Sequence, residues 1–258
     1  MSRETDARRL YDTPGVGSAY RDARALPADT ERLWSDVIRR AVGATPVRLA
    51  IDVGAGTGRF TARLVDALAA RVIAIERGAS MIDAREPGAR RSVTWVRGDA
   101  AALPIRTGAA DLVMLSMVYH HFGDAAGVVR RELRRVLGAG GLVLLRTPTH
   151  ETLREFEWMR FFPESLSLDL ARMPTIALAI DDFRAAGFSC RDHSVVRQRI
   201  AANVAEYVVR IRSRAFSSLQ AVPDDVWAQR LAVFEAHCRT LVDGPIEEPV
   251  DLFVFEAT

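Results

Sequence analysis

The chain has 258 residues, 49% of them hydrophobic and 26% charged, which is typical of a globular protein large enough for one α/β domain or two small ones. The formal net charge of +2 is too close to zero to indicate a nucleic-acid or membrane partner, although all 35 basic residues are arginine. The two cysteines, Cys190 and Cys238, form no CxxC unit, so we expect neither a disulfide framework nor a bound metal.

The first part of the chain alternates between helical and strand patterns. Amphipathic stretches predict helices, and short, continuously apolar runs between them predict buried strands. Strands without polar alternation are typical of a parallel sheet covered by helices on both faces. The expected helices lie at 29–43, 60–70 and 125–138, and the expected strands at 48–54, 71–76, 93–99, 111–119 and 142–147.

The last part of the chain has a different pattern, because it begins with an aromatic-rich stretch that has no regular period. Helical and strand patterns then return, with two helices interrupting the last two strands. The irregular stretch lies at 155–174, the helices are expected at 181–188, 201–220 and 224–243, and the strands at 188–200 and 248–257.

Three alternating glycines follow the first predicted strand, in the pattern Asp52-x-Gly54-x-Gly56-x-Gly58. A dinucleotide-binding loop has the spacing G-x-G-x-x-G, and its third glycine would fall on Arg59, which we expect to point along the following helix. The spacing therefore disfavours a nicotinamide-dependent oxidoreductase, which remains a remote alternative.

Acidic residues end the next two predicted strands. Glu76 stands where a carboxylate can accept hydrogen bonds from both ribose hydroxyls of a nucleoside, and Asp99 where one can accept from an adenine amino group. Either residue could instead be an ordinary cap or turn residue. Together with the glycine loop, they favour a nucleoside cofactor.

Five segments resemble, in order and spacing, the class I S-adenosylmethionine-dependent methyltransferases, in particular the ubiquinone/menaquinone and natural-product branch. The resemblance covers about residues 47–147 and implies a Rossmann-like, doubly wound α/β fold. Its seven-stranded sheet would be mostly parallel, with an antiparallel last strand and a helical lid or insertion. The segments are AIDVGAGTGRFT, AIERGASMIDAR, RGDAAALP, DLVMLSMVYHHF and RRVLGAGGLVLLR.

The resemblance also implies which residues contact S-adenosylmethionine. Tyr20 and Arg24, in AYRDARALP, would reach the methionine carboxylate, and the main chain at Ser116 would lie beside the sulfonium. Glu76 would bind the ribose, Asp99 and Ala100 the adenine, and Met81 would pack on its face. The glycine loop, which would face the methionine part, comprises Asp52, Gly54, Ala55, Gly56 and Gly58.

The acceptor side is less clearly marked. His120 and His121 are candidate general bases; if they lie on a strand, they point to opposite faces, so that one faces the cleft. An apolar substrate pocket is expected from aromatic residues, which could instead be plain core. We expect 1–28 and 149–175 to form a mobile cover that closes over it. The pocket candidates are Tyr11, Tyr119, Phe156, Trp158, Phe161 and Phe162.

No linker or repeat divides the chain, so we expect a single domain, residues 1–258. Its expected parts are an N-terminal cover (1–28), a cofactor-binding core (29–147), substrate-side insertions (148–175 and 201–244) and the remaining sheet strands (176–200 and 248–258).

The expected function is methyl transfer to an oxygen, nitrogen or carbon atom of a small, apolar or aromatic metabolite. The alternative is a cyclase or binding protein that keeps the cofactor without transferring its methyl group. With no apolar leader or membrane-length apolar stretch, we expect a cytoplasmic monomer or homodimer.

Overall fold

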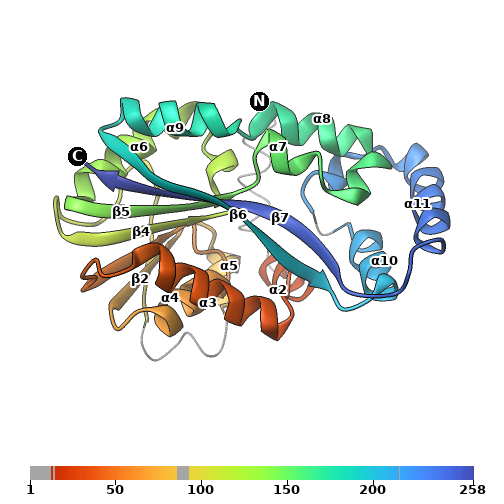
Figure 1. Ribbon diagram of the computed structural model, residues 1–258, viewed down its shortest axis with the longest axis horizontal. Helices are drawn as coiled ribbons and strands as arrows, with labels where there is room; N and C mark the ends of the chain where they lie inside the picture. The colour runs from red at the N-terminus through yellow and green to blue at the C-terminus, as the bar shows by residue number, and fades with distance from the viewer. Residues whose placement is uncertain (1–12, 14, 86–92, 215) are drawn as a thin grey trace.

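A seven-stranded sheet forms the centre of the computed structural model, which describes residues 13, 15–85, 93–214 and 216–258 (Figure 1). The strand order is β3-β2-β1-β4-β5-β7-β6, and β7 runs antiparallel to both its neighbours, so the predicted fold is confirmed. The strands are β1 (Leu49–Val53), β2 (Arg71–Glu76), β3 (Val93–Arg97), β4 (Ala110–Ser116), β5 (Leu137–Thr147), β6 (Phe188–Ala201) and β7 (Ile246–Ala257).

Helices cover both faces of the sheet, α3 and α4 on one and α6 and α9 on the other (Figure 1). On β4, Leu112 and Met114 pack toward α3 and α4, whereas Val113 and Leu115 pack toward α6 and α9. Both sets are fully buried, which explains the unbroken apolar run of this strand. The helices of this layer and the sheet edge are α2 (Val16–Ala23), α3 (Ala28–Val42), α4 (Arg59–Ala67), α5 (Ala79–Asp83), α6 (Ala126–Val136) and α9 (Ile176–Ala185).

A third core lies beyond one end of the sheet, where β6 and β7 extend past the other strands (Figure 1). The ring of Phe162 stacks on Trp227 with centroids 5.2 Å apart, and Trp158 stacks on Phe216 at the same separation. The stretch at 155–174 is therefore not irregular: Pro163 begins a helix at a position that needs no N–H donor. The elements here are α7 (His150–Leu153), η4 (Glu157–Arg160), α8 (Pro163–Arg172), α10 (Val204–Arg212), η5 (Leu219–Ala221) and α11 (Asp224–Cys238).

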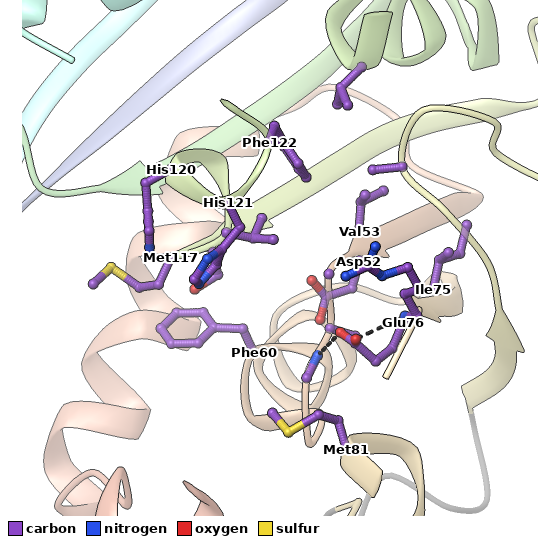
Figure 2. Close-up of a pocket in the computed structure, with 18 of the residues that line it drawn as sticks. Asp52, Val53, Phe60, Ile75, Glu76, Met81, Met117, His120, His121 and Phe122 are labelled. Carbon is purple, nitrogen blue, oxygen red and sulfur yellow. Dashed lines mark hydrogen bonds between the residues drawn. The ribbon is translucent and has the colours of Figure 1, made fainter. Parts of the chain in front are cut away.

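Strand β4 ends at Ser116, three residues earlier than predicted. Met117 then adopts a φ of 56°, a left-handed conformation that is uncommon outside glycine, and its N–H donates to a β5 carbonyl. The chain continues as a short 3-10 helix, η2 (Tyr119–His121), which places His120 and His121 close to Met117 (Figure 2). The prediction that the two histidines lie on a strand and point to opposite faces is therefore wrong. A second 3-10 turn, η3 (Gly123–Ala125), leads into α6.

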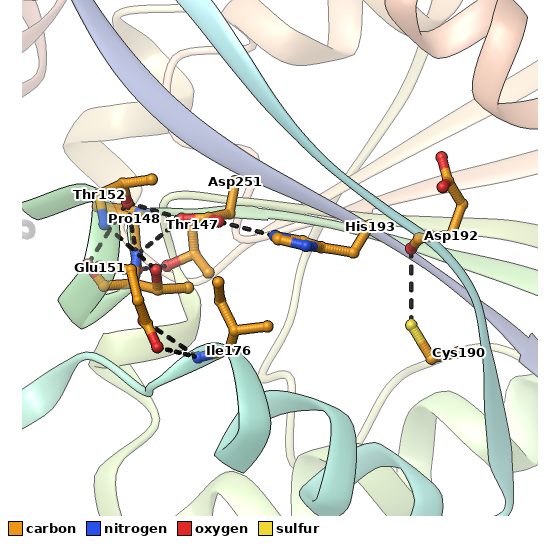
Figure 3. A network of polar contacts seen from close by, with 10 residues as sticks. Thr147, Pro148, Glu151, Thr152, Ile176, Cys190, Asp192, His193 and Asp251 are labelled. Atoms are coloured by element: carbon orange, nitrogen blue, oxygen red, sulfur yellow. Dashed lines mark hydrogen bonds and ion pairs between the residues drawn. The ribbon is translucent and has the colours of Figure 1, made fainter.

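A buried carboxylate joins α7 and the edge strand β6 to β7 (Figure 3). Asp251, which is fully buried on β7, accepts hydrogen bonds from the Thr152 hydroxyl at 2.6 Å and the Thr149 N–H at 3.0 Å. Its other oxygen lies 2.8 Å from Nε2 of His193 on β6. The two threonines also form the capping box that begins α7. Asp251 thus fixes the start of the segment that leads to the third core.

We expect Asp251→Ala to lower the free energy of unfolding by about 3 kcal/mol, because it leaves buried donors without an acceptor. Urea unfolding of the variant measures this change. The control is Asp192→Ala, since Asp192 is exposed on the neighbouring edge strand β6. Equal stability losses in the two variants would contradict the role assigned to Asp251.

Candidate active site

A cavity of about 750 Å³ opens at the carboxyl ends of the parallel strands, between β1 and β4, where the strand order reverses. Open α/β sheets bind their ligands at this point. Helices α2 and α8 and the turn η5 also contribute to its wall. The sequence-predicted residues that line it are Tyr20, Asp52, Gly54, Ala55, Gly56, Glu76, Met81, Asp99, Ala100, Ser116, His120 and His121.

The cavity has two chemically different ends (Figure 2). Glu76 and Met81 lie at one end, the two histidines and Met117 lie at the other, and the Phe60 ring forms the wall between them. All three acidic residues in the lining, Asp52, Glu76 and Asp99, come from the ends of β1, β2 and β3. They therefore belong to the first end.

Glu76 holds the backbone of the glycine loop. Its Oε2 accepts the Gly56 N–H at 2.9 Å, while Oε1 accepts the N–H groups of Arg77 at 2.8 Å and Gly78 at 2.7 Å. Gly56 has a φ of 58°, which glycine adopts without steric cost. A carboxylate has about four acceptor positions, and three of them are occupied here.

Asp52 is 1% exposed at the end of β1 and accepts a hydrogen bond from the Thr61 hydroxyl at 2.5 Å. Burial raises the pKa of Asp52 to about 7, the Thr61 hydrogen bond opposes this shift, and the nearby Glu76 charge adds to it. Near neutral pH the side chain is therefore divided between its neutral and charged forms.

Asp99 both lines the cavity and closes a turn, because its Oδ1 accepts the Ala101 N–H at 2.8 Å. Asp99 is therefore a turn residue, and its position in the cavity lining also allows it to bind a ligand.

The rings of His120 and His121 lie together, with centroids 4.0 Å apart. Burial lowers the pKa of His120 well below its usual value, and the neighbouring His121, Arg172 and Arg24 lower it further. His121 lines the cavity, and desolvation, followed by the charges of Arg172 and Arg24, lowers its pKa to about 4. Both imidazoles are therefore neutral at pH 7.

Two predicted cofactor residues lie next to the cavity rather than in its lining. Gly58 caps α4, and a Cβ there would meet the Trp95 ring at 2.7 Å, so the position requires glycine. The Arg24 guanidinium lies over the rings of Phe216, at 4.3 Å, and Tyr20, at 5.5 Å.

The described aromatic residues that were candidates for a substrate pocket do not line this cavity. Tyr119 is buried, and its hydroxyl donates to Asp182 of α9, so it faces the core of the sheet. The remaining aromatic candidates lie in the third core, packed against α10 and α11, where the interior offers them more apolar contact than the cavity does. The residues placed outside the lining are Phe156, Trp158, Phe161 and Phe162. Tyr11 lies outside the described residues.

Sequence reasoning missed several residues of the wall. Arg59 lines the cavity instead of pointing along its helix. Leu168, Arg172 and Ala221 also line the cavity, and only their place in the fold reveals this. Arg146 is almost completely buried below the cavity, between the rings of Phe60 and Trp34, and an arginine within an apolar strand was the available signal.

Arg146 has hydrogen bonds but no carboxylate partner among the described residues. Its Nη2 donates to Gln198 at 2.7 Å and its Nη1 to Ser116 at 3.3 Å. Gln198 also accepts from the Trp34 indole at 2.8 Å. The side chain of a cavity-lining serine is thus held from beneath by a buried cation.

A family profile described as "Methyltransferase domain" matches residues 51–145. An uncharacterized methyltransferase of Mycobacterium leprae is 34% identical over 137 residues, which cover 52% of this chain and 49% of that protein. A demethylmenaquinone methyltransferase of Corynebacterium kroppenstedtii is 31% identical over 134 residues, covering 52% and 56%. The chain thus spans about half the length of these relatives.

Solved structures share the fold over most of the chain. A protein of Anabaena variabilis, assigned as a methyltransferase of an antibiotic biosynthesis pathway, superposes with a TM-score of 0.67 at 18% identity, covering 92% of this chain and 99% of that one. A phosphoethanolamine N-methyltransferase of Haemonchus contortus, complexed with S-adenosylhomocysteine, gives 0.64 at 16%, covering 100% and 60%. A cyclase of the 4+2 type gives 0.57 at 18%, covering 88% and 80%.

Residues 51–145 thus match a methyltransferase domain profile, and the sheet that contains them has the fold of the superposed methyltransferase structures.

Two further findings concern the described residues alone. None of their helices has the length and apolar character needed to cross a membrane. No group of three or more histidine, cysteine, aspartate or glutamate side chains among them could hold a metal ion.

We expect the buried Asp52 to make the ligand-free protein less stable as the pH rises from 5 to 8. Its pKa of about 7 exceeds the ordinary 3.8, so the folded state binds the proton more tightly, and this contribution is lost as pH rises through 7. Urea unfolding of wild type and Asp52→Asn measures it. The stability difference, wild type minus variant, should fall by about 2 kcal/mol over this range.

The comparison removes the effect of Glu248, whose pKa burial also raises to about 7, because this residue is present in both proteins. Asp225→Asn, which makes the same substitution at an exposed position, is the control variant. A pH-independent difference for Asp52→Asn would mean that Asp52 is ionised throughout.

Proposed function

We propose that the chain binds S-adenosylmethionine in this cavity and transfers its methyl group to an oxygen, nitrogen or carbon atom of a small acceptor. The observation that supports this best is the convergence of Asp52, Glu76 and Asp99 on one end of the cavity, next to a glycine loop that Glu76 itself holds. A nucleoside cofactor needs carboxylates at these strand ends and a close approach of backbone between them. The family match and the fold agree with this assignment.

The cofactor would lie along the cavity with its adenosine at the acidic end. Glu76 retains about one acceptor position for a ribose hydroxyl, so we revise the expected contact with both hydroxyls to one. Asp99 and Met81 would hold the adenine. Tyr20 lines the cavity near the glycine loop and, together with Arg24 and Arg59, would serve the methionine carboxylate.

Methyl transfer is an in-line displacement from a reagent that already carries a good leaving group. The protein has mainly to hold nucleophile, methyl group and sulfur in line, and such alignment contributes about 7–11 kcal/mol in well-oriented reactions. The cavity volume of about 750 Å³ lies within the range of pockets that hold drug-sized ligands, so a cofactor and a small acceptor can be bound together.

His120 and His121 would meet the acceptor as neutral imidazoles. A general base is most effective when its pKa lies near the working pH, and both pKa values lie well below 7. We therefore assign the pair chiefly to hydrogen bonding and orientation of the acceptor, and proton removal only from an acceptor that is itself acidic.

The alternative is a protein that keeps the cofactor and uses the cavity for another reaction, as the name of the similar cyclase illustrates. The cofactor site would be the same in both cases. Only transfer of the methyl group separates them.

We expect the purified protein to bind S-adenosylmethionine and S-adenosylhomocysteine with micromolar affinity and to show no measurable binding of NAD. Isothermal titration calorimetry tests the binding. Tritium transfer from methyl-labelled S-adenosylmethionine to a pool of phenols, amines and carboxylic acids tests the reaction. Binding of NAD alone would falsify the cofactor assignment, and binding without transfer would favour the alternative.

Glu76→Gln should weaken S-adenosylmethionine binding about 10- to 100-fold, because a charge-assisted hydrogen bond to the ligand is lost and the amide N–H₂ opposes backbone donors. Calorimetric titration of the variant measures this change. Glu247→Gln, at an exposed position on β7, is the control. If Glu76→Gln folds and binds normally, the carboxylate serves only the turns at the strand ends.

A further inference from the structure

Arg172, the last residue of α8, lines the histidine end of the cavity. Its Nε and Nη2 donate to the same oxygen of Asp169, at 2.8 and 2.5 Å, and Nη2 also donates to the Ser217 hydroxyl at 2.9 Å. These contacts fix the guanidinium plane on one edge. Its Nη1 makes no hydrogen bond to any residue that the structure describes. The N–H groups on this side of the guanidinium are therefore fixed in position and can donate to a ligand.

A second arginine–aspartate pair with the same spacing is exposed and serves for comparison. Arg184 and Asp181 of α9 have the same spacing, but their side chains are 68% and 67% exposed. The side chains of Arg172 and Asp169 are 23% and 7% exposed. A surface pair contributes little to stability, whereas burying this pair costs desolvation. The burial of Asp169 therefore serves to orient a guanidinium toward the cavity.

The surroundings of Arg172 lack a negative charge on the cavity side. The lining residues from η2, α8 and η5 are His120, His121, Leu168, Arg172 and Ala221, none of them acidic. The positive charge of Arg172 also reaches both imidazoles, because it lowers the pKa of each. In addition, the buried Nδ1 of His120 has no hydrogen-bond partner among the described residues.

We propose that Arg172 is a specificity-determining residue that binds an oxyanion of the methyl acceptor, with His120 as a second hydrogen-bonding group. Arginine binds carboxylate and phosphate oxygens through charge-assisted hydrogen bonds, and these are strongest where water is excluded. The apolar part of the acceptor packs on Leu168 and Ala221. This inference rests on the proposed function, which places the cofactor at the opposite, acidic end.

The test uses the full chain, labelled with ¹⁵N-histidine and saturated with S-adenosylhomocysteine. Sodium benzoate, phenyl phosphate and neutral benzamide are titrated separately, and the signals of His120 and His121 are followed by NMR. We expect an anion to shift these signals to saturation and benzamide to bind at least about tenfold more weakly. The first two probes distinguish a carboxylate from a phosphate as the preferred group.

The variant is Asp169→Asn/Arg172→Gln, which removes the charge pair without leaving a buried carboxylate unpaired. It should bind S-adenosylhomocysteine like wild type and the preferred anion about 10- to 100-fold more weakly. The matched control is Asp181→Asn/Arg184→Gln, which changes an exposed pair of the same spacing and should leave both affinities unchanged.

Four results overturn the proposal. The first two are equal binding of anions and benzamide, and no shift of the histidine signals by either anion. The third is unchanged anion binding by the Asp169→Asn/Arg172→Gln variant. The fourth is loss of S-adenosylhomocysteine binding in that variant, which would assign Arg172 to the cofactor. If wild type does not bind S-adenosylhomocysteine, the proposed function fails separately. In that case the same titrations are made on the unliganded protein, and the same results support or overturn anion binding by Arg172.

Discussion

The carboxylate of Glu76 accepts three backbone N–H groups from two separate turns, and the form of the acidic end of the cavity depends on these hydrogen bonds. One turn follows β1 and contains Gly56, and the other follows β2 and contains Gly78. Neither turn is part of a helix or strand ladder, so their N–H groups need another acceptor. The side chain that we propose as the ribose ligand thus also holds the two turns that line this end of the cavity.

The parallel sheet explains why the charges of the cavity are divided. Strands β1, β2 and β3 end side by side and bring Asp52, Glu76 and Asp99 to one end. Burial raises the pKa of Asp52 there, and the charge of Glu76 adds to this shift. Beyond β4 the chain supplies histidines from η2 and an arginine from α8. A ligand that spans the cavity therefore meets acceptors at one end and donors at the other.

Much of this arrangement could be predicted from the sequence. The order of strands, the glycine loop and the acidic strand ends depend on short segments, because a strand that ends in a loop at the edge of a parallel sheet leaves its next side chain at the site. Ten of the twelve predicted residues in the cavity lining lie at or soon after the ends of β1 to β4, whereas Tyr20 lies on α2 and Met81 on α5. The antiparallel last strand also followed from the resemblance and is confirmed.

The acceptor side could not be predicted, because it depends on contacts between distant segments. The sequence around the aromatic residues at 156–162 does not show whether their rings face the cavity or a core. Packing against α10 and α11, which are distant in the sequence, places them in the third core. Likewise, the apolar run that contains β4 continues to Tyr119, and nothing in it indicates that the strand ends at Ser116, before the two histidines. The left-handed Met117 that ends it is a residue type that rarely adopts this conformation.

The helices α10 and α11 form the connection between two adjacent antiparallel strands, β6 and β7. A unit attached in this way can change in length or sequence without altering the order of the strands or the turns that follow β1 and β2. Of its described residues, Ala221 reaches the cavity, and Ser217 holds Arg172. Under the proposed function, divergence in this one insertion would therefore change the acceptor and leave the cofactor site unaltered.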